Sequence, residues 1–399
     1  MRRFVTPGVV IGPLAGVKVV EFAGIGPAPF CGMMLADAGA DVIRIDRLPG
    51  GAVPELLALG RSGTTDRGRV SLRLDLKHPR GLASALALIE RADLLIEGFR
   101  PGVMERLGVG PDVCAERNPR LVYGRMTGWG QGGPLASRAG HDINYIAITG
   151  ALASIGEPDR PPVPPLNLVG DFGGGAMLLG FGLLCALIEA RSSGRGQVVD
   201  AAMCDGAALL MANIYSRKSA GLWSSRRGAN ALDGGAPWYA SYACADGKYI
   251  AIGAIEPQFH AQLLARCGID DPLLAPQWDE TLWPQQKQRL AEIFRSRTRD
   301  EWCALTAGSD ACLSPVLDLD EAPDGEHLRA RNTFAGDEAA PQPAPRFSRS
   351  TAHTPPPLQT STAAVIELLE RWGFASAEAE DVLDGVVSTP AAKTGGREP

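Results

Sequence analysis

Residues 19–47 read VVEFAGIGPAPFCGMMLADAGADVIRIDR and contain the pattern that decides the fold. The apolar run at 17–22 predicts a strand, residues 28–39 predict a helix rich in Ala, Met and Leu, and residues 41–46 predict a second strand. Two strands joined by a helix at this spacing are typical of a parallel βαβ unit with a right-handed crossover.

The alternation of strands and helices continues along the first half of the chain. Residues 79–92 predict an amphipathic helix opened by a proline, and apolar helices are predicted up to residue 191 and at 198–211. Further strands are predicted at 70–76, 93–97 and 121–126. This half therefore predicts an α/β fold built on a parallel sheet.

The pattern changes from about residue 237. Two runs of alternating residues, 238–243 and 248–254, flank an Asp-Gly turn and predict a β-hairpin. Helices are predicted at 257–267, 283–297 and 299–307, and a strand at 314–319. These elements predict a second, smaller α+β unit. Beyond it we expect a proline-rich linker at 339–357, a helix at 363–374 and a disordered tail at 388–399.

The composition excludes several classes of protein. The chain has 399 residues, of which 45% are hydrophobic and 21% charged, and its formal net charge is −6. A general nucleic-acid binder needs a surplus of basic residues, which this chain lacks, so we expect no nucleic-acid partner. The eight cysteines contain no C-x-x-C pair and the five histidines no H-x-x-x-H spacing, which disfavours a disulfide scaffold and a metal site. Because no 18-residue uncharged apolar run occurs, we expect a soluble, cytoplasmic protein that binds no membrane.

The loop after the first strand resembles the start of a dinucleotide-binding fingerprint. Residues 24–27 read GIGP, but the third glycine of that motif would fall at Pro29. The second strand ends in Asp46, which could hold a ribose, and Arg47, which suits a phosphate or an adenine face better. A tight strand-to-helix turn is the favoured interpretation, and nicotinamide binding is the alternative.

The segment GHDINY at 140–145 is the first candidate for chemistry and precedes a helical run at 146–152. His141 is expected at a helix start, where backbone N–H groups are unpaired and the dipole disfavours a cation. Its imidazole would then stay neutral and accept a proton, while the N–H of Asp142 could stabilise an oxyanion. The alternative is a histidine that caps the helix or forms a hydrogen bond in the core.

The segment NLVGDFGGG at 167–175 is the second candidate. Three glycines beside Asp171 would let the backbone approach a ligand closely, and the alternative is an ordinary N-cap aspartate. His141 and Asp171 lie thirty residues apart, each predicted ahead of a helix, and a proline-rich loop at 157–165 joins them. This arrangement can place the two side chains on opposite sides of one cleft.

Charged residues at element ends are further candidates. Glu256 follows the strand at 248–254 and precedes Pro257, so it is either a solvent-facing cap or a partner that orients His141. Basic residues at strand ends and helix starts can bind phosphates, although each alone is typical of surface charge: Arg47, Lys77, Arg100 and Arg106.

Together these segments resemble the family III CoA-transferases, and within them the branch that racemises 2-methylacyl-CoA thioesters. The resemblance runs from about residue 12 to 335. Transferases of the family share the acid of GDFGGG but usually lack a histidine at the position of His141. The matching stretches are 19–47, LDLK (74–77), GFRPGV (98–103), GHDINY (140–145), PLNLVGDFGGG (165–175), GRGQVVDAAMCDG (194–206), LDGGAPWY (232–239) and GAIEPQF (253–259).

The resemblance implies a reaction in which the α-proton leaves one face of the thioester and a proton returns to the other. His141 and Asp171 would be the two bases, with Glu256 bonded to His141. Asn167 and the backbone of Asp142 would assist at the thioester oxygen. No cofactor or metal is implied, because CoA enters as part of the substrate.

The resemblance also implies an architecture. A Rossmann-like large domain at 12–215, rejoined by about 335–387, would be combined with a small α+β domain at 225–330. Two chains would form an intertwined homodimer whose sites join the large domain of one chain to the small domain of the other. Met203 would border the acyl chain. The implied CoA contacts are Arg47, Leu74, Asp75, Leu76, Lys77, Arg100, Arg106, Gly140, Asp142, Ile143, Asn144 and Tyr145.

Some positions depart from the family pattern. The loop at 48–66 is longer than usual, Val70 stands where a basic residue is frequent, and 354–362 lacks a P-G-E-H-T-like run. None of these positions is a proposed base. Two alternatives stay open: a CoA transferase with Asp171 as nucleophile, and a CoA-binding protein without catalytic activity.

Overall fold

The computed structural model describes residues 12–47, 63–336, 339–350 and 354–386. The chain forms two compact units: the first contains residues up to 149, 166–210 and from 340 onward, and the second contains 150–165 and 211–339. Residues 150–165, which fall inside the predicted large domain at 12–215, thus group with the second unit. The predicted tail at 388–399 and most of the long loop at 48–66 lie outside the described residues.

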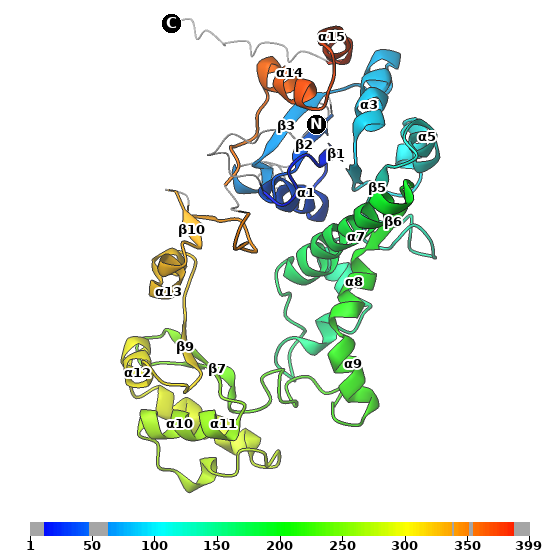
Figure 1. Cartoon of the computed structure of the whole chain (residues 1–399). Coiled ribbons are helices and arrows are strands. Elements are labelled where there is room, and N and C mark those ends of the chain that lie inside the picture. The colour runs from blue at the N-terminus through cyan, green and yellow to red at the C-terminus, as the bar shows by residue number, and fades with distance from the viewer. Residues whose placement is uncertain (1–11, 48–62, 337–338, 351–353, 387–399) are drawn as a thin grey trace, which may run out of the picture. The chain divides into compact units, whose positions relative to one another are not determined.

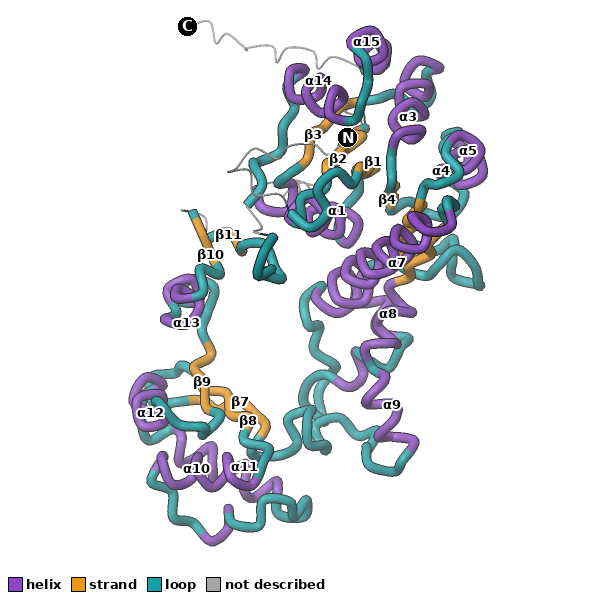
Figure 2. The backbone as a smooth tube through the Cα atoms, viewed as in Figure 1, coloured by secondary structure: helices purple, strands orange, loops and turns teal. Residues whose placement is uncertain are grey.

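The first unit is built on a six-stranded parallel sheet of order β3-β2-β1-β4-β5-β6 (Figure 1, Figure 2). The order reverses between β1 and β4, as in a Rossmann sheet, which binds its ligands in the crevice at that point. The predicted α/β fold is confirmed. The strands are β1 (Lys18–Phe22), β2 (Asp41–Asp46), β3 (Arg69–Arg73), β4 (Leu94–Glu97), β5 (Val122–Thr127) and β6 (Val198–Ala202).

Core residues lie on both faces of this sheet, because successive side chains of a strand point to opposite sides. Val19 packs with residues of α1 (Pro27–Asp37) and α7 (Leu178–Ser193). Its neighbour Val20 belongs to a second cluster, with residues of α3 (Pro79–Arg91), α14 (Thr362–Arg371) and α15 (Ser376–Asp384). Burial on both faces explains the nearly continuous apolar runs of the central strands.

The helix predicted at 198–211 is wrong. Its first part is the strand β6, which pairs in parallel with β5 from Tyr123↔Val198 to Thr127↔Ala202, and only α8 (Met203–Leu210) is helical. The β-branched pair Val198 and Val199 favours a strand. Pairing at the sheet edge therefore outweighs the apolar, helix-like composition of the whole run.

A π-helix, η4 (Leu168–Met177), leads directly into α7. Gly174 makes its packing possible, because an added Cβ would lie 2.7 Å from the backbone nitrogen of Ala207 in α8. Together η4 and α7 form a 26-residue helix whose most apolar 18-residue window has a mean hydropathy of 1.8, long and apolar enough by composition to cross a membrane. Of that window 44% is buried inside the protein, so length and composition alone do not assign the helix to a membrane.

The second unit contains an antiparallel sheet of order β7-β8-β9 (Figure 2). The predicted hairpin is confirmed, with Tyr239 opposite Gly253 and Ala243 opposite Tyr249. Phe294 and Trp302 are the largest side chains of the core beneath it. Its elements are α9 (Ala212–Ser219), β7 (Tyr239–Ala243), β8 (Tyr249–Gly253), α10 (Pro257–Cys267), α11 (Trp283–Phe294), α12 (Arg299–Thr306) and β9 (Leu313–Val316).

The remaining elements are short. They are η2 (Gly63–Asp66), α4 (Val103–Arg106), α5 (Pro111–Arg117), α6 (Asp142–Ala147), η3 (Leu152–Ser154), η5 (Pro272–Leu274), η6 (Ala322–Asp324), α13 (Glu326–Ala330), β10 (Phe334–Ala335) and β11 (Ala340–Pro341).

Candidate active site

His141 is the N-cap of α6, as the sequence predicts. Its backbone N–H donates to Oδ1 of Asn144 at 3.1 Å, and its side chain is exposed. The start of α6 is held by Tyr145, whose hydroxyl donates to the carbonyl of Gly140 and whose ring meets the Trp129 ring edge-on at 4.7 Å. His141 thus stands at a fixed helix start with its ring available to a ligand.

Asp142 connects this helix start to the segment that carries the second candidate base. Its Oδ2 accepts a hydrogen bond from the backbone N–H of Asp171 at 2.7 Å. Gly170 allows the approach, because an added Cβ there would lie 2.6 Å from the same oxygen. Asp142 itself is only 7% exposed. The segments of His141 and Asp171 are therefore joined directly, although thirty residues separate the two in sequence.

Asp171 lies inside η4, and the N-cap of that π-helix is Asn167. The alternative of an ordinary N-cap aspartate is therefore wrong, because the helix begins one turn earlier than expected. The Nδ2 group of Asn167 donates to Oδ2 of Asp171 at 3.1 Å. The resemblance implies a role for Asn167 at the thioester oxygen, and its hydrogen bond to the Asp171 carboxylate was not predicted.

Burial raises the pKa of the Asp171 carboxyl above its ordinary value. The hydrogen bond from Asn167 lowers this pKa, the negative charge of Asp142 raises it, and the positive charge of His141 lowers it. His141 and Asp171 are thus close enough to influence each other electrostatically. A partly buried carboxyl with a raised pKa beside a histidine is a candidate acid–base pair.

Gly26, in the loop after β1, lies next to the Asp171 carboxylate. It precedes α1 with φ 70° and ψ −121°, and an added Cβ would lie 3.1 Å from Oδ2 of Asp171. The glycine loop after β1 is therefore a tight turn packed on the carboxylate. No local pattern in the sequence indicates this contact, because Gly26 and Asp171 lie far apart along the chain.

The three glycines after Asp171 contact protein backbone and side chains. An added Cβ at Gly175 would meet Met203 Cγ at 3.0 Å and Pro27 Cβ at 3.2 Å. The expectation that these glycines admit a ligand is wrong at Gly174 and Gly175, which are buried against α8 and α1. Met203 is 7% exposed and belongs to the core cluster that contains Tyr145.

Asp46, the acid considered for a ribose, already has partners inside the protein. Its Oδ2 accepts from Arg44 Nη2 at 3.1 Å and from the hydroxyl of Ser71. The side chain of Arg47 is exposed and lies over the ring of Phe99, with 5.0 Å between guanidinium carbon and ring centroid. This arrangement disfavours nicotinamide binding and leaves Arg47 available for an anion.

The side chain of Glu97, the last residue of β4, binds the backbone of the loop that follows this strand. This fully buried carboxylate accepts from the Phe99 N–H at 2.7 Å and from Arg125 Nε at 3.0 Å. Burial raises the pKa of Glu97 to about 7, although the Phe99 N–H and Arg125 lower it. Glu97 was not predicted as a site residue. Its position, an acid at the end of a buried apolar strand, is the feature of the sequence that could have indicated it.

The remaining predicted CoA contacts differ in accessibility. Lys77, Arg100, Arg106, Ile143 and Asn144 have exposed side chains. Leu74 is 3% exposed and packs in the core, so only its backbone can meet a ligand. Asp75 and Leu76 are half-buried, and Asp75 Oδ1 accepts from the Lys77 N–H at 3.0 Å.

Glu256 belongs to the second unit, where it is the exposed N-cap of α10. This position agrees with the first of the two interpretations of Glu256, that of a solvent-facing cap. Its predicted contact with His141 stays a prediction.

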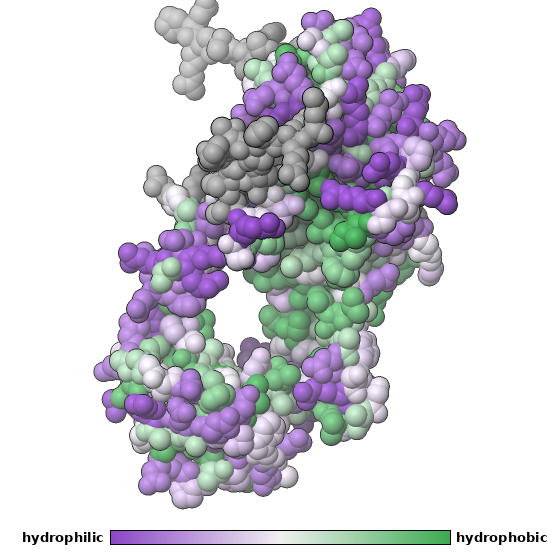
Figure 3. Space-filling model, viewed as in Figure 1, coloured by the Kyte–Doolittle hydropathy of each residue, from purple (hydrophilic) through white to green (hydrophobic). Residues whose placement is uncertain are grey.

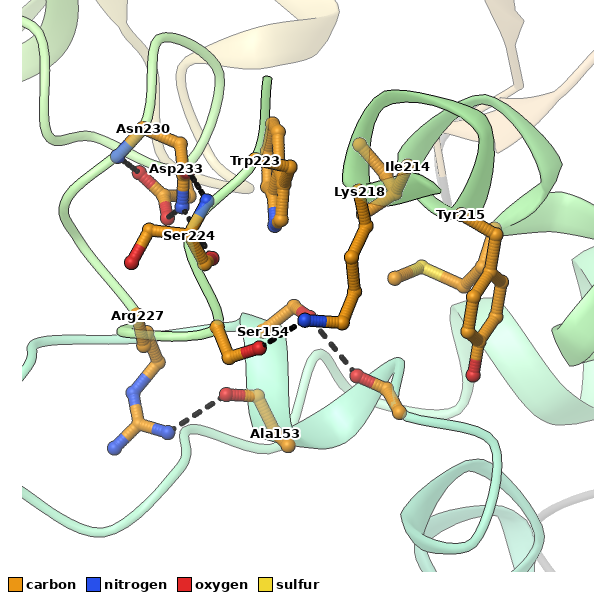
Figure 4. Close-up of a pocket in the computed structure, with 13 residues that line it drawn as sticks. Ala153, Ser154, Ile214, Tyr215, Lys218, Trp223, Ser224, Arg227, Asn230 and Asp233 are labelled. Atoms are coloured by element: carbon orange, nitrogen blue, oxygen red, sulfur yellow. Dashed lines mark hydrogen bonds between the residues drawn. The ribbon is translucent and has the colours of Figure 1, made fainter. Parts of the chain in front are cut away.

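A pocket of about 190 Å³ lies within the second unit (Figure 4). Its cations are engaged: the guanidinium of Arg227 donates to the carbonyl of Ala153 at 2.7 Å, and Lys218 Nζ donates to Ser225 Oγ at 2.5 Å. None of the proposed catalytic residues lines it. Since its charged groups already have partners, it carries no evidence for an anion site.

The described part of the chain contains no candidate metal site, that is, no group of three or more His, Cys, Asp or Glu side chains that could hold a metal ion. All eight cysteines are free.

Comparisons with known proteins identify the family of the chain. The model of CoA-transferase family III matches residues 14–363. The mouse (Mus musculus) protein named alpha-methylacyl-CoA racemase is 44% identical over 369 residues, covering 92% of this chain and 94% of that protein. The human (Homo sapiens) protein of the same name is 42% identical over 372 residues, with the same coverage. A CAIB/BAIF family protein from Brucella suis superposes with a TM-score of 0.75 at 25% identity, covering 90% of this chain and 100% of that one. The chain therefore belongs to CoA-transferase family III.

Proposed function

We propose that this protein is an isomerase that racemises the α-carbon of 2-methylacyl-CoA thioesters by transfer of protons between the substrate and two bases. The observation that carries the proposal is the joining of the His141 and Asp171 segments through Asp142, with both candidate bases in one electrostatic environment. The racemase names of the mouse and human relatives support it.

The reaction needs no redox partner. One base takes the α-proton, and the electron pair of the broken C–H bond is delocalised onto the thioester oxygen as an enolate. The other base, which is protonated at the start, returns a proton to the opposite face of the carbon. In one direction Asp171 is the base and His141 the acid, and in the other direction the roles exchange. No cofactor is proposed.

Stabilisation of the enolate is assigned to groups around the helix start. The N–H of Asp142 occupies the first position of α6, where the helix itself supplies no acceptor. A fixed N–H donor directed at a developing oxyanion is worth a large factor in rate. The Nδ2 group of Asn167 is the second proposed donor, and it holds Asp171 in this structure.

CoA binding is assigned to basic residues near the carboxyl ends of β2, β3 and β4. Arg47, Lys77, Arg100 and Arg106 are exposed there or in the following loops and helices, where a 3′-phosphate and a diphosphate need cations. Met203 is proposed to border the acyl chain. Contacts of this kind bind CoA and orient the α-carbon between the bases without taking part in proton transfer.

The active assembly is proposed to be a homodimer in which Glu256 of one chain supports His141 of the other. The first unit exposes several large apolar side chains on neighbouring helices. Single exposed apolar residues are normal on a protein surface, but a group of them indicates an interaction surface. Figure 3 shows green side chains gathered where Figure 1 places α7 and α8. The exposed large apolar side chains of the first unit include Ile148 (61% exposed), Met177 (57%), Phe181 (68%), Ile188 (69%) and Leu209 (61%). A second copy of the chain would cover them.

A reducing, cytoplasmic location is proposed because all eight cysteines are free.

The alternative is a CoA transferase in which Asp171 attacks the thioester carbonyl, releasing the CoA thiolate and forming a mixed anhydride. The thiolate then attacks the aspartyl carbonyl, which releases the acyl carboxylate and leaves an aspartyl-CoA thioester. One experiment separates the two functions. A single enantiomer of a 2-methylacyl-CoA is incubated with the protein in D2O, without any free carboxylate, and followed by NMR. Deuterium at C2 together with interconversion of the enantiomers supports racemisation. No exchange, combined with CoA transfer to an added carboxylate and trapping of Asp171 by hydroxylamine, would support the transferase.

A further inference from the structure

The Asp142 side chain occupies the junction of the two segments that carry the candidate bases. It follows His141 directly in sequence, and its Oδ2 binds the backbone N–H of Asp171 at 2.7 Å. Its other oxygen, Oδ1, is buried and accepts no hydrogen bond from the described residues. A buried carboxylate with one unpaired oxygen costs free energy, so a stabilising role alone does not account for it.

We propose that the Asp142 side chain is a positioning residue of the reaction: it fixes the His141 segment against the Asp171 segment and so sets the separation of the two bases. This inference rests on the proposed racemase function. The side chain is 93% buried, since 7% is exposed, and therefore acts through its neighbours. The backbone N–H of the same residue keeps its separate role at the thioester oxygen.

The geometry restrains Asp171 from two sides. The Asp142 carboxylate holds the backbone N–H, while Asn167 holds the Asp171 carboxylate at 3.1 Å. Loss of the Asp142 bond would free the backbone of the π-helix to move relative to α6. A displacement of about 1 Å in a catalytic group can reduce the rate by about a hundredfold.

The charge of Asp142 gives the same residue a second effect. Its carboxylate raises the pKa of Asp171, with burial as the larger cause. The other groups acting on this carboxyl are Asn167 on η4 and His141 on α6, which both lower its pKa, and Tyr145 on α6 is itself influenced by Asp171. A two-base racemase uses Asp171 both as carboxylate and as acid, so a raised pKa brings these two states closer in energy.

The test uses the full-length protein and two variants of one residue, with racemisation of a 2-methylacyl-CoA measured in D2O. Asp142→Ala removes both the acceptor and the charge, and we expect kcat to fall by about ten- to a hundredfold while KM changes by less than about threefold. Asp142→Asn keeps an acceptor for the Asp171 N–H, and we expect it to recover most of kcat. Since it lacks the negative charge, the acid limb of its pH profile should move to lower pH. Asp112→Ala, which removes an exposed acid from the first turn of α5, is the control and should leave kcat unchanged.

The outcomes are decisive in each direction. Equal kcat values for Asp142→Ala and the wild type would overturn the proposal, and so would equal losses in Asp142→Ala and Asp142→Asn. If Asp142→Ala does not fold, a hundredfold loss of kcat in folded Asp142→Asn, which keeps the acceptor for the Asp171 N–H, overturns the proposal. Failure of the racemase function itself is recognised separately, because the wild type would then show no exchange at C2.

Discussion

Gly26→Ala tests whether the turn after β1 is shaped around the Asp171 carboxylate. Gly26 has φ 70° and ψ −121°, a conformation that residues with a Cβ rarely adopt. Forcing alanine into it costs on the order of 1–3 kcal/mol. The new Cβ would also lie 3.1 Å from Oδ2 and 3.6 Å from Cγ of Asp171, closer than ordinary van der Waals contact for the oxygen.

The carboxylate would have to move by a few tenths of an ångström to relieve this contact, and its bond to Asn167 would be disturbed. We therefore expect the free energy of unfolding to fall by about 1–3 kcal/mol. The racemisation rate per folded molecule should fall by about tenfold, since the base is displaced from its productive position. Urea unfolding measures the first effect, and NMR of C2 exchange in D2O the second.

Gly194→Ala is the matched control. Gly194 also has positive φ, 76°, at the end of α7, but nothing lies within 4 Å of an added Cβ. This variant should lose about 1 kcal/mol of stability from backbone strain and keep its rate. Equal rates in Gly26→Ala and Gly194→Ala would refute the argument that Gly26 is shaped around Asp171.

Three further predictions concern the rest of the molecule. The raised pKa of Glu97, about 7, means that its contribution to stability is present at low pH and is lost as the pH rises through about 7. The free energy of unfolding between pH 5.5 and 8 should therefore fall less in Glu97→Gln than in the wild type, and equal falls in urea titrations would contradict this. Phe99→Leu removes the ring beneath Arg47, so KM for acyl-CoA should rise by about two- to fivefold at unchanged kcat; an unchanged KM in steady-state kinetics would argue against Arg47 as a CoA contact. Phe181→Glu places a charge on the exposed apolar side of α7 and should shift the proposed dimer towards monomer in sedimentation velocity. An unchanged sedimentation coefficient would contradict an interface on α7.

The sheet could be predicted because its strands are buried on both faces. β1, β2 and β4 are short runs rich in apolar residues, and such runs between turn residues are typical of strands buried on both faces. β6 lies at the edge, where Val198 is 47% exposed, and the run continues into α8 without a break. The composition of that segment could not show where pairing ends and the helix begins.

The candidate site was predicted in its residues more than in its geometry. His141 was expected at a helix start because GHDINY places short polar residues ahead of an apolar run, and it lies there. The π-helix around Asp171 was not expected, since three glycines are compatible with many conformations and α8 selects one of them. The contacts of Asp171 with Gly26 and Asp142 depend on tertiary structure, which no local pattern reports.

The central claim is that His141 and Asp171 are the two bases of one racemisation. The most direct test follows the interconversion of each pure enantiomer of a 2-methylacyl-CoA in D2O by the wild type, His141→Ala and Asp171→Ala. We predict that the wild type interconverts both enantiomers with deuterium at C2, and that each variant loses between about a hundredfold and ten-thousandfold of this rate in both directions. Full interconversion by the folded His141→Ala protein would contradict the account.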